Sequence, residues 1–174
     1  MNKIKFALAF FTGLLMYSCS DSEEAVLYDN YDFISIKGDS VISSDGLQMV
    51  ASTVDITSDS LGTYYTINSQ VTVGNNVFDV TLFMEGANAG IKKYKLEAGE
   101  PLTAIGYVKY RSMQADSSFV TDRYAITSSI IEWKDVDNKT VLFDVLCNGT
   151  KMLNDSTLSK ASIIIDGKIR AIKQ

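Results

Sequence analysis

The sequence contains no histidine, and this absence excludes the commonest catalytic base. Ser-His-Asp and Cys-His machinery requires an imidazole, and so does zinc held by histidine. No glycine-rich phosphate loop precedes a helix pattern either. The sequence therefore predicts a non-enzymatic protein with no catalytic residue, no metal and no cofactor. An enzyme that uses two carboxylates, as glycosidases do, needs only Asp or Glu, and it is the least favoured alternative.

Long hydrophobic runs are also lacking. The apolar stretch from Phe6 to Met16 has only 11 residues, whereas a transmembrane helix needs about 20. It follows Lys3 and Lys5 and is followed by Ser18-Cys19, which is the layout of a bacterial lipoprotein signal peptide. We therefore expect residues 1–18 to be a signal peptide and Cys19 to carry the lipid, palmitate among its acyl chains.

The segment 19–30 is expected to be an acidic tether between the lipid and the folded domain. Its first residues resemble the export signal that sends lipoproteins of the Bacteroidota to the outer cell surface; they are Ser20, Asp21, Ser22, Glu23 and Glu24. The resemblance implies a protein anchored by lipid in the outer membrane and facing the cell exterior. A generic acidic spacer is the alternative, and it would leave the protein on the periplasmic face.

Positive charge is scarce. The chain has 16 Lys and Arg against 21 Asp and Glu, a net charge of −5. Removal of residues 1–18 takes away Lys3 and Lys5 and no acid, so that 14 basic and 21 acidic residues leave a net charge of −7. Such a surface excludes nucleic acid as a partner, because phosphates require neutralisation by Lys and Arg. The partners that remain are the membrane through the lipid, a glycan, or another envelope protein.

Cysteine occurs only twice, at Cys19 and Cys147. If Cys19 carries lipid, Cys147 has no partner for a disulfide within the chain. Cys147 follows Val141, Phe143 and Val145 at alternate positions, which places all four on one face of a strand. We expect Cys147 to be a buried core residue and not a nucleophile.

Helical periodicity is absent after the signal peptide, and alternation of apolar and polar residues takes its place. The single proline, Pro101, lies between two alternating segments. The pattern predicts ten short strands, at 47–56, 63–73, 77–84, 91–96, 103–111, 118–127, 131–133, 140–147, 161–165 and 169–172. Residues 148–159 are predicted to be a polar loop, and Asp166-Gly167 a tight turn. Residues 31–174 are thus expected to form a single all-β domain, an antiparallel β-sandwich of about nine to ten strands, with a lipocalin-like barrel as the alternative.

The segment from Gly90 to Lys173 resembles a group of small, uncharacterised lipoproteins of the Bacteroidota. The resemblance rests on three stretches, Ile91–Leu96, Trp133–Lys139 and Ile163–Ile172. Where the group has two alternating aromatic residues, this chain has Val145 and Cys147. The resemblance covers about half of the chain and implies an all-β fold and an envelope location. It implies no activity.

Tyrosines on the predicted strands are the candidate ligand residues. Tyr64, Tyr65, Tyr107 and Tyr110 are a possible platform on which sugar rings stack, although tyrosine is also a favoured strand residue. The sequence therefore favours a binding or accessory module tethered through Cys19. The alternative function is a lipocalin-like carrier that holds a small apolar ligand in an internal cavity.

Aspartates in predicted turns offer two further features. Asp135 and Asp137 lie in one turn, where they could present two carboxylates to Ca²⁺. The favoured alternative is a solvated turn in which Asp accepts backbone hydrogen bonds. Three Asp-Ser pairs resemble O-glycosylation sites of the Bacteroidota, at Asp39-Ser40, Asp59-Ser60 and Asp155-Ser156. Modification there is expected to affect solubility and not activity.

Overall fold

The computed structural model describes residues 31–38, 41–86, 90–135 and 137–174. The predicted signal peptide, Cys19 and the acidic tether lie outside this part of the chain. The described residues form nine strands and no helix, which confirms the predicted all-β class. The strands are β1 (Phe33–Gly38), β2 (Val41–Ser58), β3 (Thr63–Val73), β4 (Asn76–Glu85), β5 (Gly90–Lys95), β6 (Gly106–Met113), β7 (Phe119–Asp135), β8 (Thr140–Asn154) and β9 (Thr157–Lys173). Nothing in these ranges forms a helix of the length and apolar character that a membrane span requires.

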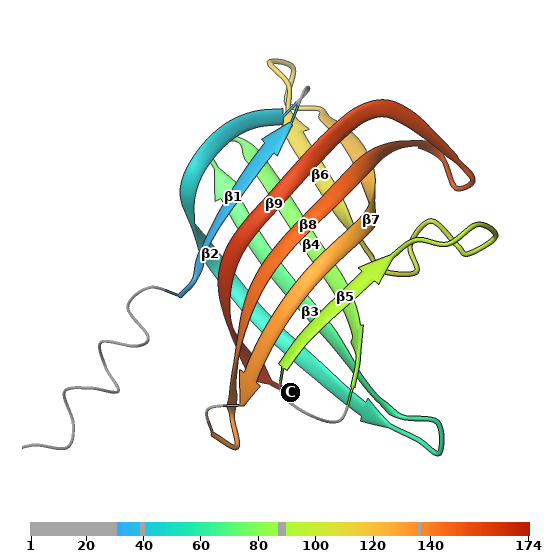
Figure 1. Cartoon of the computed structure of the whole chain (residues 1–174). Helices are drawn as coiled ribbons and strands as arrows, with labels where there is room; N and C mark the ends of the chain where they lie inside the picture. The colour runs from blue at the N-terminus through green and yellow to red at the C-terminus, as the bar shows by residue number, and fades with distance from the viewer. Residues whose placement is uncertain (1–30, 39–40, 87–89, 136) are drawn as a thin grey trace, which may run out of the picture. The chain divides into compact units, whose positions relative to one another are not determined.

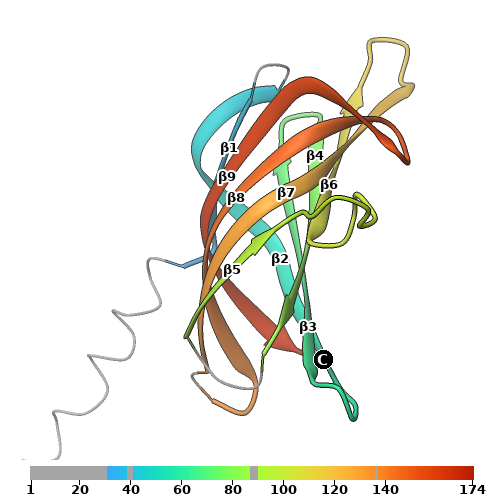
Figure 2. The same cartoon turned by 45° about the vertical axis from the view of Figure 1, so that its right-hand side comes forward.

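The strand pairs form a closed circuit in residues 31–174 (Figures 1 and 2). From β1 the antiparallel pairs run through β2, β3, β4, β6, β7, β8 and β9 and return to β1. The exception to antiparallel pairing is a short parallel contact in which Thr53 and Val54 of β2 lie opposite Ile172 and Lys173 of β9. Opposite sides of this circuit face each other across one core, so the predicted sandwich and the predicted barrel describe the same set of strands.

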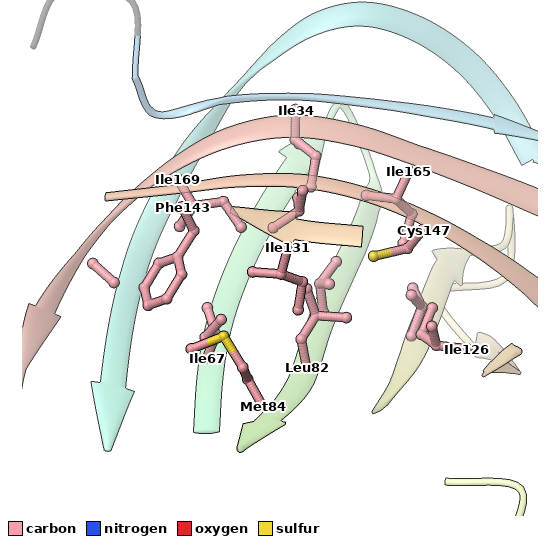
Figure 3. Close-up of a cluster of buried hydrophobic side chains, with 14 of the residues drawn as sticks. Ile34, Ile67, Leu82, Met84, Ile126, Ile131, Phe143, Cys147, Ile165 and Ile169 are labelled. Atoms are coloured by element: carbon pink, nitrogen blue, oxygen red, sulfur yellow. The ribbon is translucent and has the colours of Figure 1, made fainter. Parts of the chain in front are cut away.

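The core is built from alternate residues of the strands (Figure 3). Phe78, Val80, Leu82 and Met84 of β4 are all buried, as their shared phase predicts. On the opposite side, Ile131 of β7 and side chains of β8 and β9 point into the same cluster. Burial of alternate residues in β3 and β4 fixes their register, because a slip of one residue would turn the apolar side chains outward.

Cys147 lies in this core with no exposed surface, which confirms its predicted burial. Burial raises the pKa of its thiol to about 12, so almost no reactive thiolate forms near neutral pH. We expect iodoacetamide at pH 8 to leave Cys147 unmodified in the folded protein and to modify it quickly in 8 M urea, as measured by peptide mass spectrometry. Fast modification of the folded protein would contradict its place in the core.

The same pKa shift gives a pH dependence. The folded state favours the neutral thiol, so the stability that Cys147 contributes is complete below its unfolded pKa of about 8.5. That contribution is lost as the pH rises towards the folded pKa of about 12. Unfolding of a Cys147→Ala variant should lack this component of alkaline destabilisation.

Two sequence predictions about the end of the chain are wrong. Residues 148–159 are not a loop: β8 and β9 continue as a two-stranded ribbon, with Thr150 opposite Ser162 and Asn154 opposite Thr157. Most of this ribbon does not cover the core. Its two faces therefore do not differ in polarity, and the sequence shows no alternation of apolar and polar residues there. Asp166-Gly167 is not a turn either, since both residues lie inside β9.

Gly167 has another reason to be glycine. A Cβ atom at this position would lie 2.9 Å from the carbonyl oxygen of Phe33 and 2.9 Å from Cγ1 of Ile34. Both residues belong to β1, which pairs with β9 at this point. Gly167 therefore permits a close approach of two strands. The sequence alone does not distinguish such a glycine from one in a turn, which explains the wrong prediction at Asp166-Gly167.

Candidate functional site

The four candidate platform tyrosines do not share one surface. Tyr65 and Tyr110 are only 6% and 8% exposed. The ring of Tyr65 contacts that of Trp133 with centroids 4.9 Å apart, and the ring of Tyr110 stacks on Phe78 at 4.7 Å. Both belong to the core, so only the half-buried Tyr64 and Tyr107 face outward. Neighbouring strand residues point to opposite faces, which is why Tyr64 and Tyr65 separate.

Tyr107 borders a polar surface on the outer side of β2, β3, β4 and β6. We name this surface the polar face and define it by Asp55, Asn68, Gln70, Asp79, Thr81 and Arg111. A shallow pocket of about 270 Å³ lies over it, lined also by Ala51 and Thr53. The face arises from register: Asn68 lies directly opposite Thr81, and Gln70 directly opposite Asp79.

Two hydrogen-bonded chains fix the side chains of the polar face. In the first, the Thr81 hydroxyl donates to Oδ1 of Asn68 at 3.0 Å, and Nδ2 of Asn68 donates to Oδ2 of Asp55 at 3.4 Å. In the second, Asp79 accepts from Nε2 of Gln70 at 2.8 Å and from Nη2 of Arg111 at 2.9 Å. These bonds orient amide and carboxylate groups before any ligand arrives, which lowers the entropic cost of binding.

Aromatic rings stand beside these polar groups. Tyr107 of β6 lies opposite Thr81 of β4, and its ring centroid is 6.4 Å from that of Phe83 with the planes tilted by 55°. Both rings are half-buried, so each keeps an accessible part. Phe83 and the amide side chains of Asn68 and Gln70 were not among the residues predicted from the sequence. The sequence does contain a signal for this face. Polar residues occupy the alternate positions of β3 and β4 that point away from the core, at Asn68, Gln70, Asp79 and Thr81.

A second opening lies between β4 and β5. This β4–β5 cleft has a volume of about 440 Å³. Its lining side chains come from β3, β4, β5 and the segment before β6, and they include Tyr64, Phe83, Glu85, Tyr94, Lys95, Glu100 and Ile105. Burial raises the pKa of the Tyr94 hydroxyl, which is therefore protonated and able to donate at neutral pH. Tyr64 lines this cleft and does not line the pocket over the polar face.

Asp137 binds the backbone of its own turn. Oδ1 of Asp137 accepts hydrogen bonds from the backbone N–H groups of Lys139 at 2.6 Å and Thr140 at 2.7 Å, and the bond from Lys139 lowers the pKa of this carboxyl. Within residues 31–38, 41–86, 90–135 and 137–174, no three acidic or cysteine side chains are grouped as metal ligands. Asp59-Ser60 and Asp155-Ser156 lie at exposed hairpin tips. Asp39-Ser40 lies outside the described residues.

Comparison of the chain with known protein families, with curated proteins and with solved structures finds no match. The resemblance to small lipoproteins of the Bacteroidota therefore stays a prediction. Function has to be argued from the polar face and the β4–β5 cleft themselves.

Proposed function

We propose that this chain is a surface lipoprotein anchored through Cys19, and that its polar face binds a glycan without chemical conversion. The observation that carries the proposal is the row of oriented amide, hydroxyl and carboxylate groups next to the ring of Tyr107. Sugar hydroxyls both donate and accept hydrogen bonds, which matches this mixture of groups. The apolar C–H face of a sugar ring packs on an aromatic side chain such as Tyr107.

Charge favours a neutral glycan. The chain carries a net charge of −5, and Arg111, the cation hydrogen-bonded within the polar face, forms an ion pair with Asp79 at 2.9 Å. An anionic sugar would have to compete with Asp79 for Arg111 and would meet Asp55 nearby. A neutral oligosaccharide neither competes with Asp79 for Arg111 nor is repelled by Asp55.

The filled interior supports a binding module over a lipocalin-like carrier. A carrier needs a lined internal cavity, whereas the buried side chains of the described strands form one continuous cluster. Leu82 of β4 belongs to this cluster together with Ile131 and Phe143 of the paired strands β7 and β8 (Figure 3). The two openings described above lie at the surface.

The test is binding of the purified protein to a panel of immobilised neutral oligosaccharides, with Tyr107→Ala as the decisive variant. We expect at least one glycan to bind the wild type and the variant to bind it about tenfold more weakly, because an aromatic anchor contributes more than about 1 kcal/mol. Phe119→Ala is the matched control, since Phe119 is an exposed aromatic residue at the start of β7. Equal binding by wild type and Tyr107→Ala would remove the polar face as the site.

A further inference from the structure

Strand β5 lies outside the closed circuit, and a gap in backbone hydrogen bonding separates it from β4. Strand β4 pairs with β6 only as far as Leu82 opposite Gly106. Beyond that point the Phe83 N–H donates to the carbonyl of Ile105 at 2.8 Å, and the chain before β6 then turns away. Strand β5 pairs with β7 alone. The last residues of β4 and Tyr94 and Lys95 of β5 line the β4–β5 cleft, and the two strands do not pair with each other.

Tyr94 takes the place of a strand in this gap. Its hydroxyl accepts a hydrogen bond from the Glu85 N–H at 2.8 Å and donates one to the Glu85 carbonyl oxygen at 3.0 Å. These are the two backbone groups of Glu85 that a neighbouring strand would bind. A tyrosine side chain plus one hydrogen bond reaches across about two strand spacings of about 4.8 Å each. At Tyr94 the gap is therefore about one strand wide, whereas just beyond the end of β4 the Lys92 side chain lies against Gly86.

The other side of the gap is an open strand edge. The Leu96 N–H donates to the Thr127 carbonyl at 2.9 Å, so the even-numbered residues of β5 direct their backbone groups towards β7. The N–H and C=O groups of Ile91, Lys93 and Lys95 then lie on the edge of β5 that faces away from β7, and Lys95 is the one of the three that lines the cleft. Such an edge is a template for one more strand.

Charge indicates which strand fits. The sequence of β5 is Gly-Ile-Lys-Lys-Tyr-Lys, three lysines and no acid, in a chain of net charge −5. Lys93 and Lys95 are exposed, so that acidic residues of an added strand would form cross-strand pairs with them. Glu85 of β4 lines the cleft from the other strand, and Glu100 lines it near the end of β5, where its carboxylate accepts a hydrogen bond from the Glu97 N–H at 2.9 Å. The acidic preference is therefore confined to the positions opposite Lys93 and Lys95.

We propose that an extended acidic segment of a partner protein adds as a strand between β4 and β5. It displaces the Tyr94 hydroxyl from Glu85 and pairs with the backbone of Lys93 and Lys95. Tyr94 then serves as an internal substitute that closes the gap while the partner is absent. This proposal is independent of glycan binding, which uses the other pocket.

The probe is a ten-residue peptide of alternating glutamate and valine, added to the full-length protein. Amide hydrogen exchange should slow at Ile91, Lys93 and Lys95 when the peptide binds. A peptide with lysine in place of glutamate, and one with a central proline, should give no such protection, because the first reverses the charge and the second cannot form a strand. Equal protection by all three peptides, or none at millimolar peptide, would overturn the proposal.

A pair of tyrosine variants tests the role of Tyr94. Tyr94→Phe keeps the ring and removes both bonds to Glu85, so the glutamate peptide should bind about fivefold more tightly, since its competitor is lost. Tyr64→Phe is the control, because Tyr64 lines the same cleft without a hydrogen bond to the Glu85 backbone. The Tyr64→Phe variant should bind the glutamate peptide with the affinity of the wild type. Equal affinities for Tyr94→Phe and wild type would contradict displacement. If amide exchange at the β5 edge slows with rising protein concentration in the absence of peptide, the strand that adds there belongs to a second copy of this chain and not to a partner protein.

Discussion

Replacing Gly106 with valine is expected to lower the free energy of unfolding by roughly 2–6 kcal/mol. Gly106 has φ of 151°, a backbone conformation that side chains with a Cβ rarely adopt. A Cβ here would press against the carbonyl oxygen of Thr81 and lie 3.0 Å from Cα of Leu82. Both are backbone atoms of β4, which is held between β3 and β6. Urea unfolding followed by circular dichroism measures the loss.

Gly99 provides the matched control for this variant. It also has positive φ, 95°, but nothing lies within 4 Å of a Cβ built there. Gly99→Val should therefore cost only the conformational strain, about 1–3 kcal/mol. If the two variants lose equal stability, the close packing of β6 on β4 beside the polar face is not as described.

Replacing Cys19 with alanine is expected to move nearly all of the protein from the membrane fraction to the soluble fraction. The proposed anchor is the lipid on Cys19, and each buried methylene contributes about 0.8 kcal/mol. One acyl chain holds a protein only marginally, whereas two or more hold it stably. Removal of the attachment residue removes them all. Cell fractionation measures the distribution, and the mass of the N-terminal peptide reports the lipid on the wild type.

Cys147→Ala is the control for this experiment. Cys147 is the other cysteine of the chain, and it is buried in the core, so its loss should leave the protein in the membrane fraction. A Cys19→Ala protein that remains membrane-bound after a high-salt wash would contradict lipid anchoring. Release of both variants would indicate that misfolding, and not the lipid, determines the distribution.

Local patterns predicted the strands whose two faces differ in polarity. Phe78, Val80, Leu82 and Met84 alternate with polar residues and are all buried. Gly74 has φ of 57° and forms the turn expected between β3 and β4. The ribbon of β8 and β9 was not predicted because its faces do not differ in this way. Closure of the circuit stayed open between the predicted sandwich and the alternative barrel, because no local signal reports that β1 pairs with β9.

The candidate site was predictable only in part. Tyrosine content pointed to Tyr107, but no local signal distinguished it from the buried Tyr110, because the absolute phase of a strand depends on the whole core. The chains from Gln70 to Arg111 and from Thr81 to Asp55 depend on the register of three hairpins. The gap that Tyr94 closes depends on β5 pairing with β7 alone, outside the circuit, which is a property of topology and not of composition.

Surface exposure of the anchored domain is the central claim, and proteinase treatment of intact cells tests it most directly. We expect external proteinase to digest the wild type on intact cells. A variant with Ser20, Asp21, Ser22, Glu23 and Glu24 replaced by alanine should be digested only after the outer membrane is permeabilised. Survival of the wild type on intact cells, with digestion only after permeabilisation, would contradict the account and place the glycan-binding face in the periplasm.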